Sequence, residues 1–161
     1  MKTSQLATLF FTCLLGLMPC AATAKPFVVS ADGQEVTDSA TGLIWRRCAE
    51  GMVFSLGACT GTASTFTHEL ALARARTEAA ASGVAWRLPN VKELSSIVDI
   101  SLSSPAIDAT AFPATPADVF WSSSPDVGSP AYAWYVNFSN GAVFTGNRTY
   151  AHYVRLVRAG Q

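Results

Sequence analysis

Apolar residues recur with helical spacing directly after a turn in the middle of the chain, within residues 85–99. Pro89 favours an extended residue before it. Asn90, with Glu93 three residues later, is typical of a capping box, which satisfies the free amides at a helix start. The apolar positions that follow share one helical face, namely Val91, Leu94, Ile97 and Val98. We therefore expect a short helix that packs close to Trp86.

A second helix is predicted upstream, over residues 68–82. Thr67 is a suitable N-cap, and Gly83 is a suitable terminator because glycine adopts the left-handed conformation in which many helices end. The apolar face of this helix is weak, and we expect it to hold Leu70, Leu72 and Ala73. The charged residues are expected to face water, namely Arg74, Arg76 and Glu78.

Short extended segments are predicted before these helices. Residues 30–47 contain two such segments with turns at Asp32-Gly33 and Thr41-Gly42, and Leu43–Trp45 is the first apolar contribution to a core. Residues 57–64 are small and polar, which indicates a surface loop.

The C-terminal third of the chain has the pattern of a sheet. After an irregular, proline-containing loop over residues 101–118, strands are predicted at residues 120–124, 131–138, 142–145 and 152–158. Asn140-Gly141 is a strong hairpin signal. Trp134 alternates with apolar neighbours, and we expect both Trp134 and Trp86 in the core. The sequence therefore predicts an α+β domain with two helices packed on a small, mainly antiparallel sheet.

The N-terminal residues have the pattern of a secretory signal peptide. Lys2 precedes an apolar run from residue 6 to residue 18, and an Ala-x-Ala cleavage site ends at Ala24. We expect a signal peptide at residues 1–24, one domain at residues 25–161, and export to the periplasm or the exterior. Lipidation at Cys20 is an alternative, although the proline before it fits poorly. No later apolar run is long enough for a membrane helix.

Two cysteines remain after the predicted cleavage, Cys48 and Cys59. Disulfides form and persist in exported proteins, so we expect these two to be bridged. A zinc site needs further ligands, and the histidines, His68 and His152, are distant in sequence and from each other. We therefore expect no metal.

Charge and motifs narrow the function classes. The chain has 11 Lys and Arg and 11 Asp and Glu residues, which does not point to a nucleic-acid partner. The serines at positions 122–124 lack the context of a nucleophile elbow, and neither histidine has a partner in a catalytic motif. We expect a protein that is not an enzyme and needs no cofactor.

Five motifs in this order resemble the Lcl C-terminal domain family, which is named for the terminal domain of a collagen-like bacterial adhesin. They are Thr37-Asp38 with Thr41-Gly42-Leu43-Ile44-Trp45, Trp86-Arg87-Leu88-Pro89-Asn90 with Glu93-Leu94, Phe120-Trp121-Ser122-Ser123-Ser124, Trp134-Tyr135-Val136-Asn137-Phe138 with Asn140-Gly141, and Tyr153-Val154-Arg155-Leu156-Val157-Arg158. The resemblance covers nearly the whole predicted mature chain.

The resemblance implies an exported bacterial domain related in fold to C-type lectin-like proteins. Binding to sulfated glycans is described for the adhesin member of the family. The chain departs from the family pattern at His68, where many members carry tryptophan, and at Leu70, which replaces the usual glutamate. The calcium-binding triplets of lectins are absent, and Leu88-Pro89-Asn90 and Ser124-Pro125-Asp126 are the nearest strings.

We therefore expect a non-catalytic binding module that contacts a glycan or another surface ligand through its last hairpin. The side chains there can bond hydroxyls or stack on a sugar, and the candidates are Asn137, Ser139, Asn140, Thr145, Asn147, Arg148, Tyr150 and His152. Alternatives are an assembly protein of the cell envelope that binds a protein partner and an enzyme like the formylglycine-generating enzymes. The sequence does not fix the oligomeric state.

Overall fold

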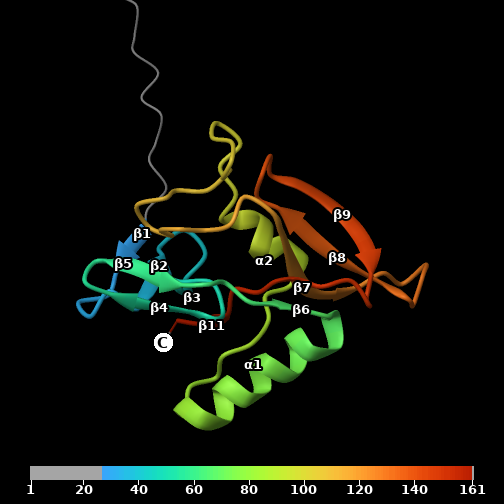
Figure 1. Cartoon of the computed structure of the whole chain (residues 1–161), viewed down its shortest axis with the longest axis horizontal. Coiled ribbons are helices and arrows are strands. Elements are labelled where there is room, and N and C mark those ends of the chain that lie inside the picture. Colours follow the sequence, from blue (N-terminus) through green and yellow to red (C-terminus); the bar gives the residue numbers. More distant parts are fainter. Residues whose placement is uncertain (1–26, 161) are drawn as a thin grey trace, which may run out of the picture.

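The computed structural model of the chain describes residues 27–160 (Figure 1). The predicted signal peptide lies outside the described residues. The helices are α1 (His68–Ser82) and α2 (Val91–Ser96). The strands are β1 (Phe27–Val29), β2 (Glu35–Asp38), β3 (Leu43–Arg46), β4 (Met52–Ser55), β5 (Ala58–Gly61), β6 (Thr65–Phe66), β7 (Val119–Pro125), β8 (Tyr132–Asn137), β9 (Ala142–Asn147), β10 (His152–Tyr153) and β11 (Val157–Ala159).

The strands of the described residues form three sheets, with the orders β1-β2-β3-β11, β6-β10-β7-β8-β9 and β4-β5. Neighbouring strands are antiparallel except for β10 and β7, which are parallel. The α+β class with two helices and mainly antiparallel pairing is confirmed. The expectation of one small sheet is wrong, because the chain divides its strands among separate sheets.

Two local predictions are wrong for the same physical reason. In segments of small or mixed residues, hydrogen bonding to a neighbouring strand determines where a strand forms, and the side-chain pattern gives little sign of it. The expected loop at residues 57–64 contains β5, which pairs with β4 in a hairpin. The expected strand at residues 152–158 divides into β10 and β11, which belong to different sheets. The buried residues between them, Val154, Arg155 and Leu156, carry the chain from one sheet to the other.

The two helices pack on opposite faces of the five-stranded sheet (Figure 1). Phe120 and Val136 point into a core with Leu94 and Ile97 of the α2 region. Trp121, the neighbour of Phe120, points into a second core with α1. Successive residues of a strand point to opposite faces, so β7 contributes to both cores.

Both predicted helix starts are confirmed. The Thr67 side chain accepts from Leu70 N, and Gly83 ends α1 in the left-handed conformation at φ 68°. Asn90 and Glu93 form the capping box of α2. Glu93 also accepts two hydrogen bonds from Arg87, each 2.7 Å long.

The predicted apolar face of α1 is wrong at Leu70, whereas Leu72 packs, partly buried, against the second core. Leu70 is 57% exposed, and the buried residues are His68, Ala71 and Ala75, because small side chains let the helix lie close to β7. The charged face is not simply solvated either. Arg74 bonds Glu50 at 2.7 Å and Glu78 at 2.5 Å, and Arg46 bonds Glu78 at 2.9 Å.

Arg155 is completely buried and joins separate segments. Its guanidinium donates to the carbonyls of Arg46 and Arg47 and, at 2.7 Å, to Thr115 Oγ1. Its charge lies 4.9 Å from the ring centre of Phe112, which like Ile107 anchors the irregular loop as predicted. Burial lowers the pKa of Arg155 to about 9, so the group is charged at pH 7.

The predicted disulfide is present. Cys48 and Cys59 are bridged, with 5.5 Å between their Cα atoms, and the bridge ties the segment after β3 to β5. Within residues 27–160, no helix has the length and apolar character needed to cross a membrane.

Candidate functional site

The predicted binding residues lie on two faces of the β8–β9 hairpin rather than on one. Side chains of directly opposed residues point to the same side of a sheet. Thr145 is opposite Trp134 and Asn147 is opposite Tyr132, so these residues share the α2 face. Asn137 is opposite Ala142 and lies two residues from Tyr135, so it points to the other face, toward α1, as does Phe144.

The three predicted asparagines shape turns. The Oδ1 atom of Asn137 accepts from Ser139 N at 2.8 Å, and that of Asn140 accepts from Ala142 N at 3.0 Å. Asn147 accepts from both Thr149 N and Thr149 Oγ1. Such bonds stabilise turns locally. Ser139 and Asn140 lie in the hairpin turn, away from Arg148, Tyr150 and His152.

Arg148 is held by the first residue of α1. Its Nε donates to His68 Nδ1 at 3.0 Å, and its carbonyl accepts from His68 N at 3.0 Å. His68 is 1% exposed, and its Nε2 lies 2.9 Å from the carbonyl of Ser122. A carbonyl only accepts, so Nε2 carries the proton and Nδ1 accepts from Arg148.

The electrostatics agree with this neutral tautomer. Burial lowers the pKa of His68, and the positive charge of Arg148 lowers it further, against the opposing effect of the Ser122 carbonyl. A neutral His68 therefore holds a cationic Arg148 without repulsion. The histidine that had no partner in the sequence acts as a support for the arginine.

A cavity of about 500 Å³ lies beside this pair, between α1 and the segment after β9. It is lined by Thr67, Glu69, Leu72, Arg76, Arg148 and Thr149. Among residues 27–160, neither arginine takes part in an ion pair, whereas Arg46, Arg74, Arg87 and Arg158 each do. We call this cavity the arginine cavity. It combines two cations with hydroxyls and one carboxylate.

Aromatic residues continue from the arginine cavity across the same face of the sheet. Tyr150, the next residue after Thr149, is 61% exposed, and its ring centre is 6.4 Å from that of His152. The ring centre of His152 is 4.4 Å from that of the buried Trp121 and 5.4 Å from that of Tyr135. Of the predicted residues, the structure thus brings Arg148, Tyr150 and His152 to one region.

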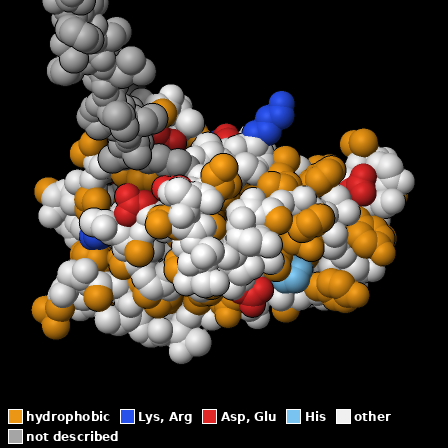
Figure 2. Space-filling view, turned by 90° about the horizontal axis from the view of Figure 1, so that it is seen from above, with side chains coloured by type: hydrophobic (Ala, Val, Ile, Leu, Met, Phe, Trp, Pro, Cys, Tyr) orange, Lys and Arg blue, Asp and Glu red, His pale blue; other side chains and the backbone are white. Residues whose placement is uncertain are grey.

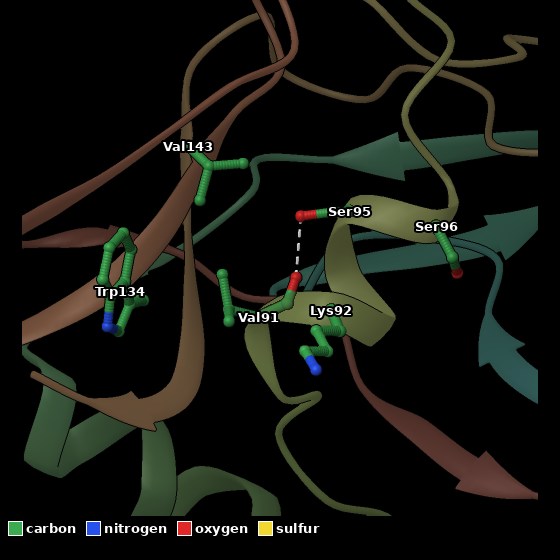
Figure 3. A pocket seen from close by; sticks show the side chains of 6 residues that line it. All are labelled: Val91, Lys92, Ser95, Ser96, Trp134 and Val143. Atoms are coloured by element: carbon green, nitrogen blue, oxygen red, sulfur yellow. Dashed lines mark hydrogen bonds between the residues drawn. The ribbon is translucent and has the colours of Figure 1, made fainter.

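A second cavity, of about 490 Å³, lies on the α2 face. It is lined by Val91, Lys92, Ser95, Ser96, Trp134 and Val143 (Figure 3). The expectation that Trp134 is a core residue is wrong, because its side chain is only partly buried. The six residues of α2 are too few to cover it. Trp86 is 4% exposed, which confirms its place in the core, but it packs in the core with α1 and not beside α2 as expected.

The described part of the chain does not bring together a group of side chains that could bind a metal ion. Within residues 27–160, no three His, Cys, Asp or Glu side chains come together in a way that would hold an ion. His68 and His152 contact the same Trp121 ring, at 5.3 and 4.4 Å. Their surroundings are thus aromatic.

Sequence reasoning missed Arg76 and the role of His68. Arg76 was assigned to a solvated helix face, and the partner of His68 is 80 residues away. A local pattern carries no signal for such a contact. The sequence offered one sign of it: a polar residue, His68, at a predicted helix start, and a polar segment after the last predicted hairpin.

Comparison with known proteins places the chain in a family. A search of curated proteins finds no match. The family model described as the Lcl C-terminal domain matches residues 34–158. The match covers nearly all of the described residues and includes both helices, β2 to β10 and the first two residues of β11. The chain therefore belongs to the Lcl C-terminal domain family.

Proposed function

We propose that this domain is a non-catalytic binding module that recognises an acidic glycan in the arginine cavity. The observation that carries the proposal is the pair of arginines there, Arg76 and Arg148, neither of which takes part in an ion pair within residues 27–160. Guanidinium groups bind carboxylates and sulfates through paired hydrogen bonds. An acidic sugar supplies such groups.

Arg148 is oriented before any ligand arrives. Its Nε is fixed on His68 at 3.0 Å, and its Nη1 is 3.5 Å from the Pro130 carbonyl, which is a long contact. The Nη groups are therefore the donors available to a ligand. Because His68 holds the side chain in place, less conformational entropy is lost on binding.

The residues around the arginines could bind the uncharged parts of a sugar, namely its hydroxyls and the apolar face of its ring. Thr149 Oγ1 donates to Asn147 and its lone pairs can accept from a hydroxyl. The ring of Tyr150 is 61% exposed and offers a flat apolar surface for the face of a pyranose. Glu69 lines the same cavity and would repel a ligand that is acidic at every position, which favours a glycan with spaced charges.

Export and a C-type lectin-like relationship of the fold belong to the same proposal. The Cys48–Cys59 bridge supports export because structural disulfides persist in oxidising compartments. The α+β architecture with two cores supports a binding role, since it holds the arginine cavity on packed elements rather than on a free loop.

A glycan array with neutral, uronate-containing and sulfated members tests the proposal. We expect the wild type to bind acidic members only, and Arg148→Ala and Arg76→Ala each to lose roughly tenfold or more in affinity, as expected for a charged hydrogen bond. Lys92→Ala is the matched control, because it removes an exposed cation on the α2 face.

Equal binding of neutral and acidic glycans would contradict the proposal, as would unchanged binding in both arginine variants. If no glycan binds, capture of an envelope protein that depends on the same arginines would favour the alternative function in assembly.

A further inference from the structure

Strand β9 forms one edge of the five-stranded sheet (Figure 1). Within residues 27–160, β8 is its sole pairing partner. An edge strand presents unpaired amide and carbonyl groups, and proteins usually protect such edges with lysine, proline or a bulge. Residues 142–147 read Ala-Val-Phe-Thr-Gly-Asn, so β9 has neither a charge nor a proline.

The register shows which groups face outward. Arg148 N donates to the Ala131 carbonyl at 2.9 Å, and hydrogen-bonded positions alternate along an antiparallel pair. In the register of β8 and β9, Ala142, Phe144 and Gly146 therefore bond β8. The amides and carbonyls of Val143 and Thr145 point away from the sheet. The carbonyl of Asn147 is already used, because it accepts from Tyr150 N.

The side chains of this edge are exposed and apolar. Phe144 is 55% exposed on the α1 face, and Val143 is 37% exposed on the α2 face. Figure 2 shows hydrophobic side chains gathered, with few charged ones among them, over the side of the molecule where β8 and β9 lie. Both faces of the edge therefore offer apolar surface beside unpaired backbone groups.

We propose that β9 pairs with β9 of a second copy of this chain, antiparallel and about a two-fold axis at Phe144. In this register Val143 is opposite Thr145 of the other copy, and each pair exchanges its outward hydrogen bonds. The sheets join into one continuous sheet. The inference does not rest on the proposed function.

A second copy fits this edge better than an unrelated strand. Every outward donor of Val143 and Thr145 meets an outward acceptor, and the used Asn147 carbonyl is not needed. The two Phe144 rings meet across the axis, where non-hydrogen-bonded pairs bring side chains closest. Neither strand carries charge, so like charges do not oppose the pairing.

The cavity on the α2 face gains a wall from this pairing. In Figure 3 the side chains of Trp134, Val91 and Val143 lie on one side of α2, and Val143 belongs to the edge strand β9. The pairing places Thr145 of the second copy next to Val143 and Val143 of the second copy next to Thr145. The two cavities then border a common apolar surface.

Analytical ultracentrifugation of residues 25–161, the predicted mature chain, tests the proposal. We expect the wild type to sediment with the mass of two chains. Val143→Pro removes an amide that points away from β8, so the hairpin keeps its own bonds while the edge is blocked. Phe144→Lys opposes like charges across the axis. Both variants should be monomers, and Val143→Ala, which keeps the amide, should remain a dimer.

A covalent probe keeps the test independent of how well these variants fold. Opposed residues in non-hydrogen-bonded pairs lie about 4.5 Å apart at Cα, within reach of a disulfide. Phe144→Cys should therefore form a cross-linked dimer under mild oxidation, and Val127→Cys, a 94% exposed position elsewhere, should not. A monomeric wild type, or dimers that survive in Val143→Pro and Phe144→Lys, would overturn the proposal.

Discussion

The Nε of Arg148 donates to Nδ1 of His68 at 3.0 Å, across a separation of 80 residues in sequence. This bond joins the start of α1 to the segment that follows the last hairpin. It exists only while His68 is neutral, because a protonated imidazole has no acceptor nitrogen. The geometry of the arginine cavity is therefore linked to the protonation state of a buried histidine.

Stability should accordingly fall in mild acid. Burial lowers the pKa values of His68 and His152 in the folded state, while the unfolded chain titrates near the ordinary value of about 6.5. Below that pH the unfolded state binds more protons, so the free energy of unfolding decreases as pH falls towards the lowered values. The contribution of the two neutral histidines to the free energy of unfolding is fully present only above about pH 6.5.

Chemical denaturation as a function of pH checks this, with His68→Gln and His152→Gln to divide the effect. Each variant should reduce part of the decrease in the free energy of unfolding that occurs as the pH falls below 7. A free energy of unfolding that rises on acidification, or one whose pH dependence neither variant changes, would exclude the linkage.

The two tryptophans should differ in their contribution to stability. Trp86 is 4% exposed in the core with α1, and Trp86→Ala should cost about 3–5 kcal/mol, as is usual for a buried aromatic residue. Trp134 is only partly buried and lines a cavity, so Trp134→Ala should cost about 1–2 kcal/mol. Urea unfolding of both variants measures the difference, and equal losses would be inconsistent with the structure.

Arg155 should be more important for folding than for binding. Arg155→Met keeps much of the volume but leaves the Arg46 and Arg47 carbonyls and Thr115 Oγ1 without their donor. An unsatisfied buried acceptor costs about 1–3 kcal/mol, so with three of them we expect a total loss of at least about 3 kcal/mol. Thermal unfolding, with the exposed Arg76→Met as control, should show a large shift for Arg155 alone.

The capping box of α2 provides a smaller, local prediction. Asn90 Oδ1 accepts from Glu93 N at 2.9 Å, and Glu93 Oε2 accepts from Asn90 N at 2.8 Å. Asn90→Ala should cost about 1 kcal/mol, and Asn90→Ser should restore most of it because serine caps well. The capping account fails if the serine variant is as unstable as the alanine variant.

The fold could be predicted where the local chemistry is explicit. Thr67 with Gly83 and Asn90 with Glu93 delimit the helices, and Asn140-Gly141 marks the hairpin between β8 and β9. Such signals act within a few residues of each other. They are therefore readable in the sequence, as is the disulfide between the two cysteines that remain after the predicted signal.

The remainder depended on distant contacts. The small residues of β5 show no alternation of apolar and polar side chains. The last predicted strand divides into β10 and β11, which belong to different sheets, and Arg155 is buried between them. Within the candidate site, Arg148, Tyr150 and His152 were predicted together. Arg76 and the support from His68 come from α1, and no local pattern connects that helix with the segment after β9.

The most direct measurement for the central claim is calorimetric titration with one acidic oligosaccharide that binds on the array, before and after its carboxylates or sulfates are neutralised. The account predicts that the wild type binds the charged form, that affinity falls as salt rises, and that neutralisation reduces affinity about as much as replacing both Arg76 and Arg148 with alanine. For that double variant, the charged and neutralised forms should differ little. An acidic glycan that binds Arg148→Ala and wild type equally, with the same dependence on salt, would contradict it.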